Sequence, residues 1–163
     1  MTINCYIIDT CSLVRLNRET PLDVYPSQWK KLEGLATQGR LIAPKEVFNE
    51  ISRADDQLKN WTKKQKKMFK EPTKKQIEIV QEILRDYPAL IDVERDFDAD
   101  PWVIALAVEM TTNPQKRLYT IKRVVVTEEK LRGNKVKIPF VCGKYSIETI
   151  DVITMFRTEG WKF

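Results

Sequence analysis

Residues 4–14 read Asn-Cys-Tyr-Ile-Ile-Asp-Thr-Cys-Ser-Leu-Val. The short apolar run before Asp9 is typical of a buried strand, and the acid and hydroxyls that follow it are a helix-start signal. Asp9 is therefore expected at the carboxyl end of a first strand. In an open parallel sheet this edge binds ligands, because loops converge there and helix N-termini point backbone N–H groups outward. The alternative is that Asp9 only caps the next helix.

The composition is that of an ordinary globular domain. The chain has 163 residues, of which 42% are hydrophobic and 31% charged, and we expect residues 1–163 to form a single domain. No apolar run approaches the ~20 residues that span a bilayer, and no signal peptide precedes the first strand. These features predict a cytoplasmic protein with no membrane partner.

Several kinds of chemistry are excluded by residue counts. The chain contains no histidine, which excludes Ser-His-Asp triads, Cys-His dyads and His-ligated metals. Its three cysteines lack CxxC spacing, so neither a disulfide framework nor a zinc site is indicated, and Cys5 and Cys142 are interpreted as buried thiols on strands. An enzyme of this composition depends on carboxylates, lysines and a bound cation. The net charge of +5 favours an anionic polymer as partner.

Strand-like and helix-like segments alternate along the chain. After the first strand we expect strands at 41–43, 89–93, 123–129 and 138–142. Helices are expected over 9–16, from about 27 to 39, after Pro44, from about 73 to 87, after Pro101 and over 146–156. This alternation predicts an α/β fold, a three-layer α/β/α sandwich with a mostly parallel five-stranded sheet and right-handed crossovers.

Acidic residues recur where predicted strands end or helices begin: Asp9, Asp100 and Glu128 or Glu129, with Glu50 about one turn into its helix. On one sheet edge these carboxylates would repel each other unless a divalent cation lay among them. Oxygen ligands without His or Cys point to Mg²⁺ or Mn²⁺, which activate water and stabilise charge on a phosphodiester. For Glu50 the alternative is a solvated helix face. Capping accounts for one aspartate, but not for the five acids in residues 92–100.

A basic run occupies residues 59–75, with eight lysines opposed only by Glu71. Such a run can neutralise several phosphates, while Trp61 and Phe69 stack on bases. The candidate RNA-binding residues are Lys63, Lys64, Lys66 and Lys67. The alternative is a solvated helix face whose aromatic side chains pack inward.

Four stretches of the chain resemble the acidic motifs of PIN domains: Ile7-Ile8-Asp9-Thr10, Val47-Phe48-Asn49-Glu50-Ile51, Asp100-Pro101-Trp102-Val103-Ile104-Ala105-Leu106-Ala107 and Val125-Val126-Thr127-Glu128-Glu129. The resemblance covers nearly the whole chain, and it is closest to VapC-like toxin ribonucleases and an uncharacterised PIN-like branch of similar length. It implies the PIN fold, with the strand order 3-2-1-4-5. Cys11 departs from the family pattern, because many members have Ser or Asn there.

The resemblance implies a Mg²⁺- or Mn²⁺-dependent endoribonuclease, the toxin of a toxin–antitoxin pair. Asp9, Glu50, Asp100 and Glu129 would be the catalytic and metal-binding residues, and Glu129 fits the Thr-x-acid spacing better than Glu128. The implied partners are RNA, an antitoxin protein and a second copy of the chain in a homodimer. Asp98 is either an additional metal ligand or a solvated loop acid.

Two other functions stay open at this point. One is a PIN-fold module that has lost catalysis and binds RNA or a partner protein. The other is a DNA-directed flap-type nuclease, which is disfavoured because the chain lacks room for the additional DNA-gripping elements of such enzymes.

Overall fold

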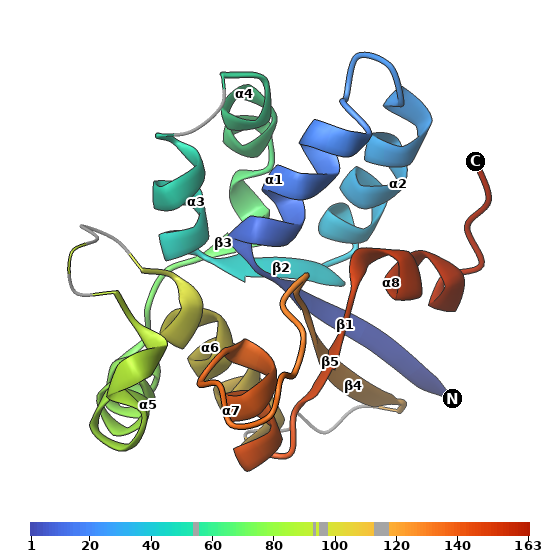
Figure 1. Cartoon of the computed structure of the whole chain (residues 1–163). Coiled ribbons are helices and arrows are strands. Elements are labelled where there is room, and N and C mark those ends of the chain that lie inside the picture. Colours follow the sequence, from blue (N-terminus) through green and yellow to red (C-terminus); the bar gives the residue numbers. More distant parts are fainter. Residues whose placement is uncertain (54–55, 93, 95–97, 113–117) are drawn as a thin grey trace.

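The computed structural model describes residues 1–53, 56–92, 94, 98–112 and 118–163. Within them the strands are β1 (Thr2–Ile8), β2 (Leu41–Pro44), β3 (Phe69–Lys70), β4 (Thr120–Val126) and β5 (Glu148–Ile150). All pair in parallel, in the order β3-β2-β1-β4-β5 (Figure 1). The predicted α/β class is confirmed, and the order 3-2-1-4-5 is the one predicted, although the third and fifth strands are different segments from those predicted.

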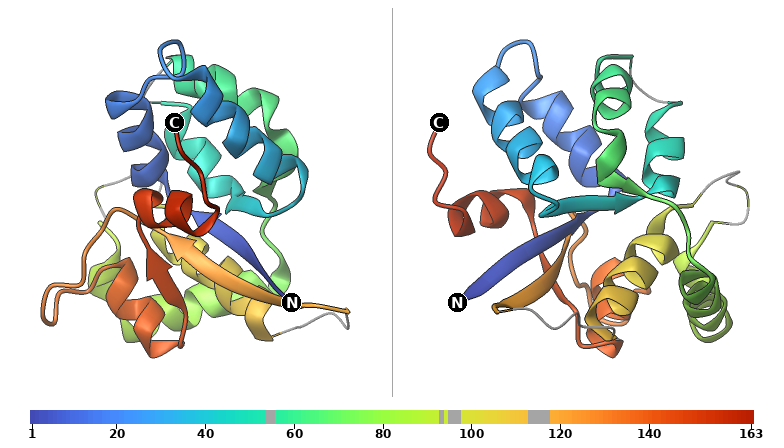
Figure 2. Two further views of the ribbon diagram at one scale, coloured as in Figure 1. Left: turned by 90° about the vertical axis from the view of Figure 1, so that its right-hand side faces the viewer. Right: turned by 180° about the vertical axis from the view of Figure 1, so that it is seen from behind.

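Helices cover both faces of this sheet. In the described residues they are α1 (Thr10–Glu19), α2 (Pro26–Thr37), α3 (Lys45–Ile51), α4 (Asp56–Lys64), α5 (Lys74–Asp86), α6 (Asp100–Thr112), α7 (Ile138–Lys144) and α8 (Val152–Thr158), with 3-10 turns η1 (Lys66–Met68) and η2 (Pro88–Leu90). Figures 1 and 2 show α1 to α4 on one side of the sheet and α5 to α7 on the other. The molecule is therefore a three-layer α/β/α sandwich.

Strand β1 is central in the sheet, and this explains its continuous apolar sequence. Tyr6, Ile7 and Ile8 have no exposed surface, because helices cover both faces of the strand. In the pairing with β4, Ile8 lies opposite Val126, so the two strands end at the same level. This register brings the residues after each strand, Asp9 and Thr127, next to each other.

Helix α6 is apolar on nearly all sides because it lies in the core. Its buried residues are Pro101, Val103, Ile104, Ala105, Leu106, Ala107 and Val108. The helix contacts α5 and α7 as well as β2 and β4, so no side of its central turns faces solvent. No helix among the described residues has both the length and the apolar character to cross a membrane.

The predicted third strand was wrong. Residues 88–90 form η2 and residues 91–92 are not in a strand, whereas β3 lies inside the lysine run. Its two residues pair with the end of β2, where Ala43 lies opposite Phe69. So short a strand is stabilised by this pairing and has no periodic pattern of its own.

The predicted fifth strand at 138–142 was also wrong. Ile138 begins α7, and Pro139 lies in its first turn, a position that favours helices. Cys142 is a buried free thiol as expected, but it lies on this helix and not on a strand. The closing helix predicted for 146–156 divides into β5 and α8, with Asp151 as the N-cap of α8.

Candidate functional site

Asp9 lies at the carboxyl end of β1, as the sequence predicted, and is almost fully buried with 2% of its surface exposed. Its Oδ1 accepts a hydrogen bond from the Ser12 N–H at 2.9 Å, which caps α1. Its Oδ2 accepts from the Thr127 hydroxyl at 2.5 Å and from the Cys11 thiol at 3.0 Å. Capping therefore uses one carboxylate oxygen, and the other oxygen joins β1 to the end of β4.

Glu50 is half-buried, so the alternative of a solvated helix face was wrong for this residue. Its Oε1 accepts from the Thr10 hydroxyl at 2.8 Å and from the Ala99 N–H at 3.2 Å. Thr10 is the first residue of α1, and Ala99 directly precedes α6. The carboxylate of Glu50 therefore connects α3 to the first residue of α1, which follows Asp9, and to the residue directly before α6, which begins with Asp100.

Asp100 is the first residue of α6, and its ionisation is strongly perturbed. Its pKa is raised from the ordinary 3.8 to about 8. Burial is the largest cause, followed by the negative charges of Glu129, Asp98, Asp9 and Glu50. The predicted acids of four different segments thus lie close enough for their charges to act on Asp100.

The two candidate glutamates after β4 point to different places. The Oε2 of Glu129 accepts from the Ile138 N–H at 2.9 Å. Burial raises the pKa of Glu129, that hydrogen bond opposes the increase, and the charge of Asp9 adds to it. Glu128 instead accepts from the Val152 N–H at 3.0 Å and pairs with Arg15 at 3.1 Å. Glu129 therefore belongs to the acid cluster, defined here as Asp9, Glu50, Asp100 and Glu129.

Asp98 organises the loop before α6. Its Oδ1 accepts from the Asp100 N–H and its Oδ2 from the Asp92 N–H, both at 3.2 Å. It is only partly exposed, and its charge contributes to the raised pKa of Asp100. Asp98 is therefore neither a fully solvated acid nor a direct member of the cluster. Asp96, another member of the acidic run, lies outside the described residues.

The donor set of the acid cluster fits a hard divalent cation, since all its ligating atoms would be carboxylate oxygens. Among the described residues, however, no group of three or more Cys, Asp or Glu side chains has converged to hold a metal ion. In this arrangement Asp9, Glu50 and Glu129 accept hydrogen bonds from the protein itself.

The sequence places two threonines of the site without giving their contacts: Thr10 in a helix-start signal, and Thr127 at a strand end where it sets the spacing to Glu129. Thr10 donates to Glu50 and Thr127 donates to Asp9, and the Thr127 oxygen also accepts from the Glu129 N–H at 3.1 Å. Each directly follows a strand or its terminal acid, and this position in the sequence is the signal that identifies them. Their hydroxyls orient the carboxylates of the cluster.

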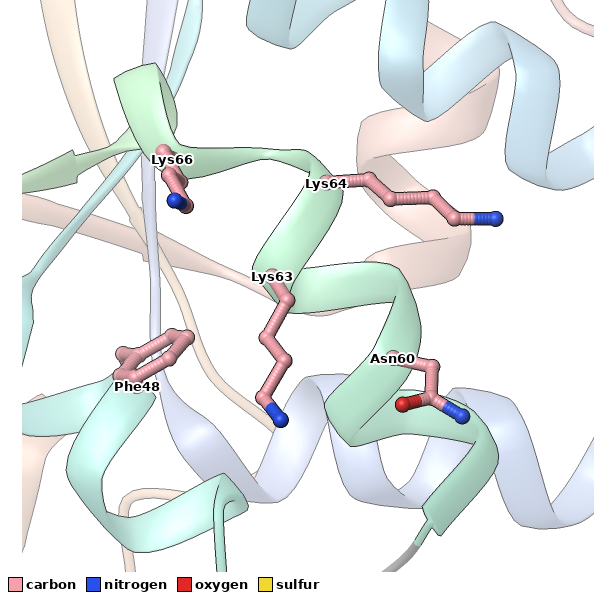
Figure 3. Close-up of a pocket in the computed structure, with 5 residues that line it drawn as sticks. All are labelled: Phe48, Asn60, Lys63, Lys64 and Lys66. Atoms are coloured by element: carbon pink, nitrogen blue, oxygen red, sulfur yellow. The ribbon is translucent and has the colours of Figure 1, made fainter.

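Three of the four candidate RNA-binding lysines lie around one hollow. Lys63, Lys64 and Lys66 line a hollow of about 660 Å³ together with Phe48 and Asn60, whereas Lys67 is not among its lining residues (Figure 3). We call this hollow the basic pocket.

Of the two alternatives for Trp61, stacking on bases or packing inward, the second is confirmed. Trp61 is 3% exposed and its indole N–H donates to Glu33 at 3.0 Å. Phe69 packs edge-on against Phe48, with ring centroids 5.5 Å apart. Both aromatic side chains of the run therefore pack inward, and the aromatic residue of the pocket comes from α3.

Comparison with known proteins gives one match. A family model described as a domain of unknown function, DUF4411, matches residues 6–163. No curated protein and no solved structure matches the chain.

Proposed function

The chain belongs to the DUF4411 family, and we propose that it is a PIN-like, Mg²⁺- or Mn²⁺-dependent endoribonuclease, acting as the toxin of a toxin–antitoxin pair. The observation that carries the proposal is the gathering of carboxylates from separate segments at one sheet edge, where Asp9 bonds to Thr127 and Glu50 bonds to Thr10 and to the residue before Asp100. Burial and these charges also raise the pKa of Asp100 to about 8. Like charges gathered at one sheet edge favour a cation among them.

Asp9, Glu50, Asp100 and Glu129 would hold the cation. When bound, it would supply activation of water and charge neutralisation on the phosphodiester. Thr127 and Thr10 hold Asp9 and Glu50 in position through their hydroxyl donors. Asp100 carries a proton below about pH 8 and must release it to become a ligand, so cation affinity is expected to rise with pH up to that value.

A second function is supported by a different observation. The described carboxylates have not converged into a metal-holding group, and their oxygens bond to protein donors. A module that binds RNA or a protein without cleaving it would need these acids only as internal hydrogen-bond acceptors. In that case the cluster would act as a structural element joining α1, α3 and α6.

The deciding experiment is cleavage of mixed cellular RNA by purified protein with Mn²⁺, with Mg²⁺ and with a chelator. Asp9→Asn and Asp100→Asn should each abolish metal-dependent cleavage, since each removes a charge while keeping the size of the side chain. Asp23→Asn is the matched control, because Asp23 is exposed in the loop between α1 and α2. Cleavage that survives both cluster variants would show that these acids do not carry the activity, and an inactive wild-type protein that still binds RNA would favour the binding module.

A further inference from the structure

The basic pocket lies between α3 and the segment formed by α4 and η1, on elements that precede α6 in the chain. Its volume of about 660 Å³ falls within the ~300–1,000 Å³ of small-molecule sites. A nucleotide-sized group therefore has room there.

The lysines of the pocket are available to an anionic partner. Across the residues that the structure describes, Lys63 and Lys66 form no ion pair with a carboxylate. Nearby Lys45, in contrast, pairs with Glu71 at 2.8 Å. An anion that enters the pocket would therefore gain attraction from Lys63 and Lys66 without displacing a carboxylate from either.

Phe48 adds an aromatic surface to these charges. It is half-buried, and its contact with Phe69 is edge-on at an interplanar angle of 65°, which fixes the ring from the protein side. In Figure 3 the Lys63 and Lys66 side chains lie on the Phe48 side of the pocket, whereas Lys64 extends the opposite way. An aromatic ring beside two ammonium groups matches a base and its adjoining phosphates.

We propose that the basic pocket binds one nucleotide of single-stranded RNA, with its base on the Phe48 ring and its flanking phosphates at Lys63 and Lys66. The proposal rests on the proposed function for the identity of the polymer. A single strand is required, because the bases of a duplex are stacked within the helix and cannot reach a side-chain ring in a pocket.

The position of the pocket relative to the acid cluster indicates which nucleotide of the RNA the pocket binds. Phe48 and Glu50 are both on α3 and two residues apart, so they project from it in directions about 200° apart. The helix, about 10 Å across with its side chains, thus separates the pocket from the cluster. The pocket binds a nucleotide flanking the scissile bond and not the one whose phosphodiester is cut.

The test is RNA binding in a chelator, which prevents cleavage, measured by fluorescence anisotropy with a single-stranded oligonucleotide of about 12 nucleotides. Phe48→Leu should weaken binding about 5-fold or more, the effect of losing one stacked base, without changing the salt dependence. Phe48→Tyr should restore it. Lys63→Gln/Lys66→Gln should flatten the slope of log affinity against log salt by about 1.4, or 0.7 for each phosphate contact.

The matched control is Lys30→Gln/Lys31→Gln, which removes two exposed lysines from α2. Melting curves verify that every variant is folded. If the control pair flattens the salt slope as much as the pocket pair, or if Phe48→Leu binds like wild type, the pocket proposal is overturned. Equal affinity for duplex RNA would also overturn it.

A second readout separates this proposal from the proposed function. In an oligonucleotide that the wild type cleaves, removing the base at one position flanking the cut should slow cleavage by wild type but not by Phe48→Leu. If the wild type cleaves RNA but no flanking base affects the rate, the pocket proposal is overturned and the nuclease proposal stands. If the wild type does not cleave RNA but its RNA binding depends on Phe48, the nuclease proposal is overturned and the pocket proposal is supported.

Discussion

Replacing Asp100 by asparagine should stabilise the metal-free protein, and increasingly so as the pH rises from about 4 to about 8. The pKa of this carboxyl is 3.8 in an ordinary environment and about 8 in the folded protein. Between these values the unfolded chain has released the proton and the native state still holds it. Raising the pH through this window therefore favours unfolding of the wild type, and asparagine, which never ionises, removes this contribution.

The effect is large enough to measure. Each unit of difference between the folded and unfolded pKa of Asp100 corresponds to ~1.4 kcal/mol of stability. A difference of only two units would therefore amount to about 3 kcal/mol. For a chain of this length that difference corresponds to a shift in melting temperature of about 6–12 °C. The assay is thermal unfolding of both proteins, with chelator, at intervals from pH 4.5 to pH 9.

Adding Mn²⁺ should favour the wild type over Asp100→Asn in the thermal melt. At a hundredfold excess over its dissociation constant, a bound cation stabilises the wild type by about 2.7 kcal/mol, and the gain should be smaller for Asp100→Asn. Melting curves that run parallel across the pH range would show that the cluster does not perturb Asp100. An equal Mn²⁺ gain in both proteins would mean that the cation binds elsewhere.

Four further substitutions test other contacts. Glu129→Gln should reduce metal-dependent cleavage far more than Glu128→Gln, which should instead lower the melting temperature, and equal losses of activity would contradict this division. Tyr6→Phe should lower the free energy of unfolding in urea by about 1.5–3 kcal/mol, because it removes the 2.6 Å hydrogen bond from the buried Tyr6 to Glu159. Asp151→Ala should cost about 1 kcal/mol at neutral pH, and the difference should vanish as the pH falls from about 4 to 2, because the capping hydrogen bonds lower the pKa of Asp151 to about 2.

Much of the acid cluster was predictable because its members occupy positions with local signals. Asp9 follows a buried apolar strand, and Asp100 begins a helix that continues with a proline and a run of apolar residues. Both signals are set by near neighbours in the chain. Glu50 has no such signal, since its spacing fits a solvated face equally well, and only its contacts with Thr10 and Ala99 place it inside.

The pocket was less predictable. Lysines at 63, 64 and 66 were expected to act together, but the choice of aromatic partner depends on which rings are buried. Trp61 lies in the same run as the lysines and is covered by the core, where it meets Trp29 at 5.0 Å between ring centroids. Phe48, which lies outside the lysine run, is the ring that lines the pocket, and no local pattern distinguishes it from Trp61.

By itself the sequence determined the α/β class, the central strand β1 and the helix starts at Asp9, Thr73 and Asp100, because hydrophobic periodicity and capping are properties of neighbouring residues. The tertiary structure decided where β3 forms and which of two adjacent glutamates enters the cluster. A two-residue strand exists only through its pairing with β2. Glu128 pairs with Arg15 and accepts a hydrogen bond at the start of α8, whereas Glu129 lies in the acid cluster. Such choices depend on partners far along the chain, and they are made only when the chain folds.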